Sequence, residues 1–139
     1  MLSINFIAIL VASVVAFIVG FLMHGPFFGK LWMRLANIVP TGNEKMSDMY
    51  PQMILNLVAN IVCATALSVV YEFAKASNYM NSSAMCVAIT CAVLVWVGFN
   101  VTATSMDVIW MKGNKKLWIF EIISSLITFV AMGVVIALF

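Results

Sequence analysis

The segment that decides the fold is Ile4–Met23, INFIAILVASVVAFIVGFLM, which contains no charged residue. A helix rises about 1.5 Å per residue, so about 20 apolar residues cross the roughly 30 Å hydrocarbon layer of a membrane. Three further runs of similar length follow, namely Pro51–Tyr71, Ala84–Met106 and Leu117–Phe139. Each run is continuously apolar, which favours helices over the alternating strands of a barrel. The sequence therefore predicts an all-α integral membrane four-helix bundle, with a single transmembrane domain over residues 1–139.

The composition of the chain supports this prediction. Hydrophobic residues make up 65% of the 139 residues and charged residues 9%, with a mean hydropathy of +1.13. A soluble domain is about half apolar and about a quarter charged, and a domain of this size could not hide so much apolar surface from water. The net charge of +2 is too small and too scattered for a nucleic-acid surface. The lipid bilayer is thus the expected partner, and no nucleic acid is expected. Because the first apolar run is longer than the core of a signal peptide, we expect it to remain as a span.

The connection between the first two runs predicts an interfacial helical elbow over residues about 26–36. Gly25-Pro26 bends the chain there. One helical face then gathers apolar side chains beside Lys30 and Arg34, as in a helix that lies in the headgroup layer; these apolar residues are Phe28, Leu31, Trp32 and Leu35. Further on, the pattern Thr41-x-x-Glu44 resembles a capping box and predicts one more short helix.

The distribution of lysine and arginine predicts the orientation in the membrane. Two connections are rich in cations and one is poor: residues 24–50 contain Lys30, Arg34 and Lys45, residues 107–116 contain Lys112, Lys115 and Lys116, and residues 72–83 contain only Lys75. Cytoplasmic loops carry the excess of such residues. We therefore expect loops 24–50 and 107–116 in the cytoplasm, both termini outside, and a multi-pass location in the cell inner (plasma) membrane.

Polar side chains within the apolar runs fall, under this topology, in the cytoplasmic half of the helices. They predict a polar pocket formed by Glu121, Asn56, Asn60, Asn100, Thr104, Ser125 and His24. Polar groups are costly in lipid, so their common depth carries information. Desolvation in such a pocket would favour the neutral carboxyl of Glu121, which could then exchange a proton or hold a cation.

Each of these residues also has a purely structural interpretation. Glu121 near the start of a helix is favoured by the helix dipole and could pair with Lys112, Lys115 or Lys116. Asn56 and Asn60 could hold neighbouring helices together by hydrogen bonds. A single imidazole, that of His24, is a poor metal site. Since no nucleotide loop, zinc motif or nucleophile elbow is present either, the sequence predicts no metal, no cofactor and no catalytic residue.

Two segments resemble a bacterial membrane family known as domain of unknown function 1761. The first is His24-Gly-Pro-Phe-Phe-Gly-Lys-Leu-Trp-Met33, which is similar to the family's aromatic-Gly-Pro-Leu-Phe-Gly-Lys-x-Trp signature. The second is Leu94–Ile122, where a short basic loop leads to Leu117-Trp-Ile-Phe-Glu121. The resemblance implies a four-helix protein of the bacterial inner membrane. His24 replaces the family's usual Tyr, so no family role transfers to it, and Glu121 replaces an Asp.

These features support two main hypotheses about function. The first is a small oligomeric transporter or channel subunit, and since four short helices enclose little volume, a pathway would form between protomers of a homo-oligomer, with a dimer favoured. The small multidrug transporters offer an architectural analogy, a four-helix chain with one membrane Glu. The alternative is a non-catalytic membrane scaffold or accessory subunit. An intramembrane enzyme would have only His24 with Asp107 or Glu121 available, so no enzyme is predicted. The sequence leaves the small-molecule or ion substrate open.

Overall fold

The computed structural model describes residues 4–40, 42, 46–77 and 82–139, and none of them forms a strand. The predicted capping residues Thr41 and Glu44 lie outside these ranges. The elements in chain order are the α-helices and short turns α1 (Phe6–Leu22), η1 (Met23–Phe27), α2 (Gly29–Leu35), η2 (Met46–Met49), α3 (Tyr50–Ala76), α4 (Ala84–Val95), η3 (Trp96–Val101), α5 (Thr102–Ile109) and α6 (Lys115–Leu138).

Four helical stretches are long and apolar enough to cross a membrane. They are Phe6–Phe27, Tyr50–Ala76, Ala84–Ile109 and Lys115–Leu138. The all-α prediction is confirmed, and the four stretches indicate a multi-pass membrane protein. The second stretch runs beyond the predicted end at Tyr71 to Ala76, and in this last part of the helix the carboxylate of Glu72 pairs with the ammonium of Lys75 at 3.1 Å.

Polar side chains fix where three of the helices begin. The carboxamide oxygen of Asn5 accepts hydrogen bonds from the N–H groups of Ile7 and Ala8, and Asn114 and Ser83 cap α6 and α4 in the same way. Such side chains satisfy the N–H groups that a helix start leaves without an acceptor. The carboxamide of Asn114 also donates to the carbonyl of Leu35 at 2.8 Å. This bond joins the end of α2 to the start of α6.

Two wide helical turns, η1 and η3, interrupt the first and third stretches. Both are π-helical, and Gly25 within η1 has non-helical backbone angles (φ −115°, ψ −106°). The predicted break at Gly25-Pro26 is therefore a kink, and the helical path continues to Phe27 before α2 begins. π-Turns re-aim side chains and occur frequently at functional sites. Both of these turns contribute residues to the site described below.

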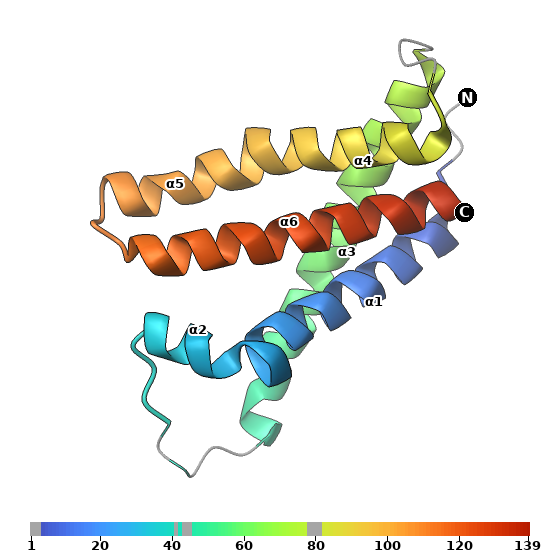
Figure 1. Ribbon diagram of the computed structural model, residues 1–139. Coiled ribbons are helices and arrows are strands. Elements are labelled where there is room, and N and C mark those ends of the chain that lie inside the picture. Colours follow the sequence, from blue (N-terminus) through green and yellow to red (C-terminus); the bar gives the residue numbers. More distant parts are fainter. Residues whose placement is uncertain (1–3, 41, 43–45, 78–81) are drawn as a thin grey trace.

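The helices are packed at one end of the molecule and spread apart at the other. Helix α6 packs along α1 and α4, and α3 packs along the same two helices on the opposite side. Figure 1 shows α4–α5 running beside α6 over its whole length, whereas α1 diverges from α6 toward α2. Both termini lie at the packed end (Figure 1).

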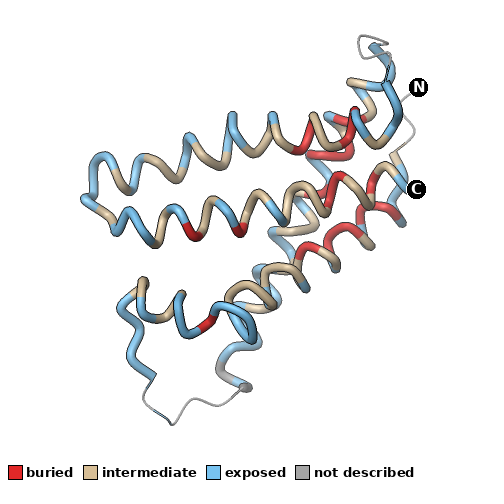
Figure 2. The backbone as a smooth tube through the Cα atoms, in the orientation of Figure 1, coloured by how far each residue is buried: buried red, intermediate tan, exposed pale blue. Residues whose placement is uncertain are grey.

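Most of the buried residues lie at the packed end, near the termini (Figure 2). Leu67 of α3 and Met132 of α6 are its largest fully buried side chains, each 1% exposed. Small residues surround them and let the helices approach closely; they include Ala8, Ala12, Ala16, Ala64, Ala88, Ala92 and Gly133. These small residues allow close contact between the helices around Leu67 and Met132, while an open cavity of about 680 Å³ lies nearer the termini.

Gly133 of α6 lies in close contact with the backbone of α4, and this gives a first prediction. A Cβ atom at Gly133 would lie 3.0 Å from the carbonyl oxygen of Ala88 and 3.1 Å from the Cβ of Ala92. We expect Gly133→Ala to destabilise the protein in detergent by about 1 kcal/mol, because overpacking forces the helices apart. The control is Gly98→Ala, where a Cβ would meet nothing within 4 Å. An equal thermal-unfolding midpoint for the two variants would contradict this prediction.

Candidate functional site: a polar groove beside Glu121

An open groove of about 350 Å³ lies between α1, α3 and α6, where these helices begin to diverge. Six of the seven residues of the predicted pocket line it: His24, Asn56, Asn60, Asn100, Glu121 and Ser125. Apolar side chains form the rest of its wall, among them Phe17, Phe21, Phe129 and Met132. The groove therefore combines a polar edge with an apolar wall. We call it the Glu121 groove.

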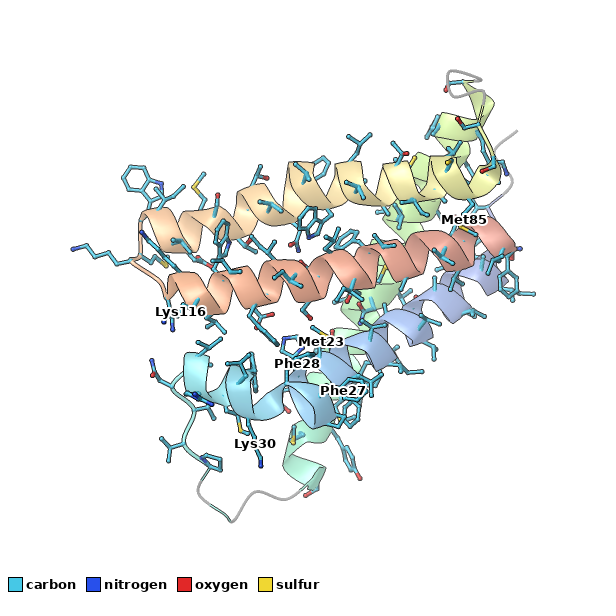
Figure 3. The ribbon with its side chains drawn as sticks, viewed as in Figure 1. Met23, Phe27, Phe28, Lys30, Met85 and Lys116 are labelled. Atoms are coloured by element: carbon cyan, nitrogen blue, oxygen red, sulfur yellow. The ribbon has the colours of Figure 1, made fainter. Side chains whose placement is uncertain are left out.

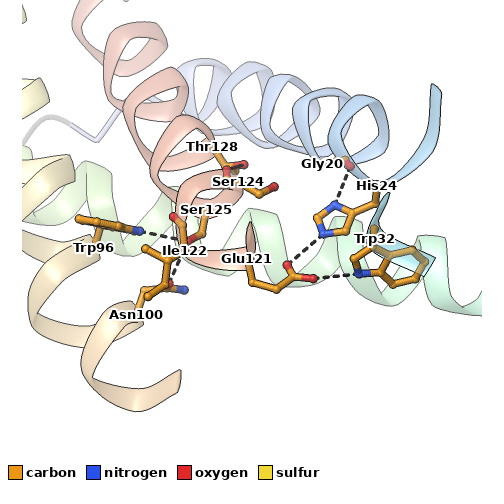
Figure 4. A network of polar contacts seen from close by, with 10 residues as sticks. All are labelled: Gly20, His24, Trp32, Trp96, Asn100, Glu121, Ile122, Ser124, Ser125 and Thr128. Carbon is orange, nitrogen blue, oxygen red and sulfur yellow. Dashed lines mark hydrogen bonds and ion pairs between the residues drawn. The ribbon is translucent and has the colours of Figure 1, made fainter. Parts of the chain in front are cut away.

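The centre of the polar edge is a pair formed by His24 and Glu121. The Nε2 atom of His24 lies 2.9 Å from Oε2 of Glu121, and the Nδ1–H of the same ring donates to the carbonyl of Gly20 at 3.0 Å (Figure 4). Both side chains are partly exposed, 31% for His24 and 41% for Glu121. Because Nδ1 must carry a hydrogen to reach a carbonyl, the proton that can be exchanged is the one between Nε2 and Oε2.

The second carboxylate oxygen of Glu121 is held by Trp32 of α2. The indole N–H of Trp32 donates to Oε1 at 2.9 Å. An indole can only donate, so Oε1 is the acceptor of this bond. The rings of Trp32 and Phe120 meet the imidazole of His24 edge to face, with centroids 5.4 and 5.6 Å away. Glu121 thus ties α6 to both η1 and α2.

A second polar cluster connects η3 with α6. The hydroxyl of Ser125 accepts a hydrogen bond from the indole N–H of Trp96 at 3.0 Å and has Oδ1 of Asn100 and the carbonyl of Ile122 as acceptors at 3.0 and 2.9 Å (Figure 4). The π-turn brings Trp96 and Asn100 to the same residue of α6. The amide N–H₂ of Asn100 has no acceptor among the described residues, so it is available to a molecule in the groove.

Asn56 and Asn60 form the α3 edge of the groove. The amide of Asn60 donates to the carboxamide oxygen of Asn56 at 3.2 Å. The structural interpretation expected these asparagines to join neighbouring helices by hydrogen bonds. This bond lies within one helix and does not do so. Their remaining donor and acceptor atoms face the groove with no partner in the described part of the chain.

Thr104 is the one member of the predicted set that lies outside the groove. Its hydroxyl accepts the indole N–H of Trp118 at 3.1 Å and donates to the carbonyl of Asn100 at 2.8 Å. These bonds place Thr104 at the contact between α5 and α6. Its role in a pocket therefore gains no support from its position.

The partner of Glu121 also differs from the structural interpretation, which paired this carboxylate with a lysine near the start of the same helix. Within the described residues its charged partner is His24, not Lys112, Lys115 or Lys116. In Figure 3, Lys116 stands at the start of α6 and Lys30 projects from the side of α2 that faces away from α6. The sequence offered Glu121 to His24 only as one of two possible partners in an enzyme, beside Asp107, and assigned no site role to Trp32. The signal that was available is that His24 and Glu121 lie at the same predicted depth in two different spans.

Trp32 gives a second prediction, since its indole N–H makes a hydrogen bond from α2 to the carboxylate of the pair. We expect Trp32→Phe to loosen α2 and to cost about 1–2 kcal/mol, in the range for a hydrogen bond to a partly exposed charged group. Hydrogen exchange of the α2 amides in nanodiscs should rise several-fold. Trp110→Phe is the control, because Trp110 is 77% exposed and its indole has no partner among the described residues. Unchanged α2 exchange in Trp32→Phe would show that the indole bond does not hold the helix.

Comparison with known proteins identifies the family. The search of curated proteins and the search of solved structures gave no match. One family model matches residues 7–137, and its description, protein of unknown function (DUF1761), names no activity. Because this match covers nearly the whole chain, the protein belongs to the DUF1761 family, as its Gly-Pro…Gly-Lys…Trp signature predicted.

Proposed function

We propose that the protein is one subunit of a small oligomeric membrane carrier, which binds a small solute in the Glu121 groove and exchanges it for a proton at the His24–Glu121 pair. The observation that carries this proposal is the 2.9 Å contact between two ionisable, partly exposed side chains at the wall of a groove within spanning helices. Ionisable residues in such segments are rare, pair with one another, and mark proton and ion pathways. The groove volume of about 350 Å³ also suits a small molecule.

In this proposal the four helices form a bundle in the inner membrane, with α2 as an elbow in the cytoplasmic headgroup layer and both termini outside. The open end, with the groove, then faces the cytoplasm. A pore straight through one protomer would have to pass Leu67 and Met132, which are fully buried. Passage to the other side therefore requires either a movement of the packed end or a second protomer, and a homodimer is the simplest assembly that supplies one.

The test is proton movement in proteoliposomes that contain entrapped pyranine. Solutes of several classes, namely organic cations, sugars and amino acids, are added outside one at a time. At least one class should drive a proton flux in the wild type, and Glu121→Gln should abolish it. The matched control is Glu72→Gln, which removes a carboxylate on α3 outside the groove. If no class moves protons in the wild type, or if Glu121→Gln retains the full flux, the carrier proposal fails.

One observation favours the alternative, a scaffold or accessory subunit without transport activity. Each oxygen of the Glu121 carboxylate already has a protein partner, and the two partners belong to different elements, η1 and α2. Such a network could serve only to hold the helices together. In that case Glu121→Gln should lower stability in every assay without any solute dependence, and a partner membrane protein should co-purify in stoichiometric amounts.

A further inference from the structure

The Glu121 groove contains few charged groups, and this restricts what it can bind. Of the residues that line it, Glu121 and His24 are the ones that carry or can carry charge, apart from the thiol of Cys63. As an ion pair the two have a net charge of zero. The other hydrogen-bonding side chains of the groove are neutral amides and hydroxyls, among them the hydroxyls of Ser124 and Ser125.

The geometry of the pair indicates which charge a ligand would carry. Trp32 donates to Oε1 of Glu121 whether or not His24 holds its second proton, so the carboxylate keeps one donor in both states. The Nδ1–H of His24 stays on the carbonyl of Gly20 in both states as well. Loss of the Nε2 proton would leave a lone pair on Nε2 of His24 facing the carboxylate oxygen Oε2 of Glu121 at 2.9 Å. The pair would then have a net charge of −1. A positive group placed at Oε2 would neutralise this charge.

The wall of the groove indicates what the rest of the ligand is like. Aromatic rings from α1 and α6 border the groove, those of Phe17, Phe21 and Phe129, beside Met132. Such rings favour an apolar body and attract a poorly hydrated cation through their faces. A metal ion would need several oxygen ligands, whereas the described residues contain no group of three or more His, Cys, Asp or Glu side chains.

We propose that the ligand of the Glu121 groove is a monovalent organic cation with an apolar body, and that its positive centre takes Oε2 of Glu121 from His24. The exchange is balanced: the imidazolium of His24 releases its Nε2 proton to solvent as the cation binds, and the groove keeps a net charge of zero. The inference names the substrate class of the proposed carrier. It rests on the proposed function only in taking the Glu121 groove as the binding site. One bound cation corresponds to one released proton.

Charged groups on the neighbouring elements must be considered in any test that uses pH. In the groove itself the titratable groups beside His24 are Glu121 from α6 and Cys63 from α3. Outside the groove lining the neighbouring elements carry Lys30 and Arg34 on α2, Lys115 and Lys116 at the start of α6, and Tyr50, Tyr71, Glu72 and Lys75 on α3. The lysines and the arginine among them are exposed. The chain has a single histidine, so its ring signals report His24 alone.

The experiment uses the full-length protein in nanodiscs, labelled with ¹⁵N-histidine, at a pH where His24 is doubly protonated. Benzyltrimethylammonium is titrated in, and its uncharged isostere neopentylbenzene serves as the matched ligand. We expect the ammonium compound to convert His24 to the neutral Nδ1–H form in a saturable manner and to release close to one proton per bound cation into weak buffer. Glu121→Gln should weaken its binding at least tenfold, and Glu72→Gln should not change it.

Three results would overturn the proposal. Equal binding of the neutral isostere would mean that the groove selects apolar shape only. Binding without proton release would mean that the cation does not replace His24 at Oε2. An equal response to sodium ions would mean that the groove is an inorganic cation site. If Glu121→Gln does not fold, the wild type still decides, because the ammonium affinity should fall about tenfold per unit of decreasing pH while the isostere affinity stays constant. These measurements need no gradient, so binding without flux in liposomes would refute the carrier and leave the ligand class intact.

Discussion

Replacing Glu121 with Leu is expected to destabilise the protein by about 2–3 kcal/mol. The change removes the acceptor of two hydrogen bonds at once, from the Trp32 indole and from the His24 ring, both at 2.9 Å. Hydrogen bonds to charged groups contribute about 1.5–3 kcal/mol each when removed, and the partial exposure of the pair, 31% and 41%, lowers that figure. Unfolding by denaturant in mixed micelles would measure the loss.

A double-mutant cycle separates the pair from the rest of this effect. His24→Leu alone leaves the carboxylate with Trp32 as its partner, whereas Glu121→Leu with His24→Leu removes both charges together. We expect the double variant to be more stable than the sum of the two single effects predicts, by about 1–2 kcal/mol. Strict additivity would show that His24 and Glu121 do not stabilise each other, which would leave Trp32 as the main reason for the effect of Glu121.

Leu67→Ala is expected to have the other large effect, a loss of about 2–5 kcal/mol. Leu67 is 1% exposed at the packed end, where it adjoins the small side chains of the neighbouring helices. Truncation of a buried leucine removes its packing contacts and leaves a cavity, in lipid as in water. The matched control is Leu55→Ala on the same helix, where the side chain is 69% exposed and a change of about 0.5 kcal/mol or less is expected.

The two substitutions should also differ in their effect on the groove. Leu67 does not line the groove. Leu67→Ala should therefore lower stability, while the affinity of the folded protein for the organic cation remains within twofold of the wild type. Glu121→Leu should lower both. A parallel loss of binding in Leu67→Ala would contradict the separation of a packed end, which provides stability, from an open end, which holds the site.

Much of this could be predicted from residue types alone. The apolar Ile4–Met23 and the three later runs predict membrane helices, because stretches of this length with no charge or a single charge match the thickness of the hydrocarbon layer. The positions of Asn56, Asn60, Asn100 and Glu121 in those runs also predict that their side chains gather at one depth, because a helix has a fixed rise per residue. The Gly-Pro…Gly-Lys…Trp signature lies in the order of residues, so the family could also be predicted from the sequence.

The partners within the site could not be predicted in this way. Depth along a helix says nothing about rotation around it, and the π-turns at η1 and η3 rotate the helix by an amount that no periodicity rule gives. These turns direct His24 toward Glu121 and Asn100 toward Ser125, and the wrong alternative, in which the lysines pair with Glu121, was equally consistent with spacing. The path of α2 brings Trp32 to the same carboxylate.

Four helices fit for a membrane, and the common depth of Asn56, Asn60, Asn100 and Glu121, therefore follow from the sequence, since hydrophobicity and helix length are properties of each segment alone. The pairing of Glu121 with His24 and Trp32, the separate position of Thr104 and the divergence of the helices around a groove emerge only in the folded protein. Those features depend on how helices rotate, bend and pack against one another. That depends on contacts between residues distant in the chain, such as Gly133 against Ala88.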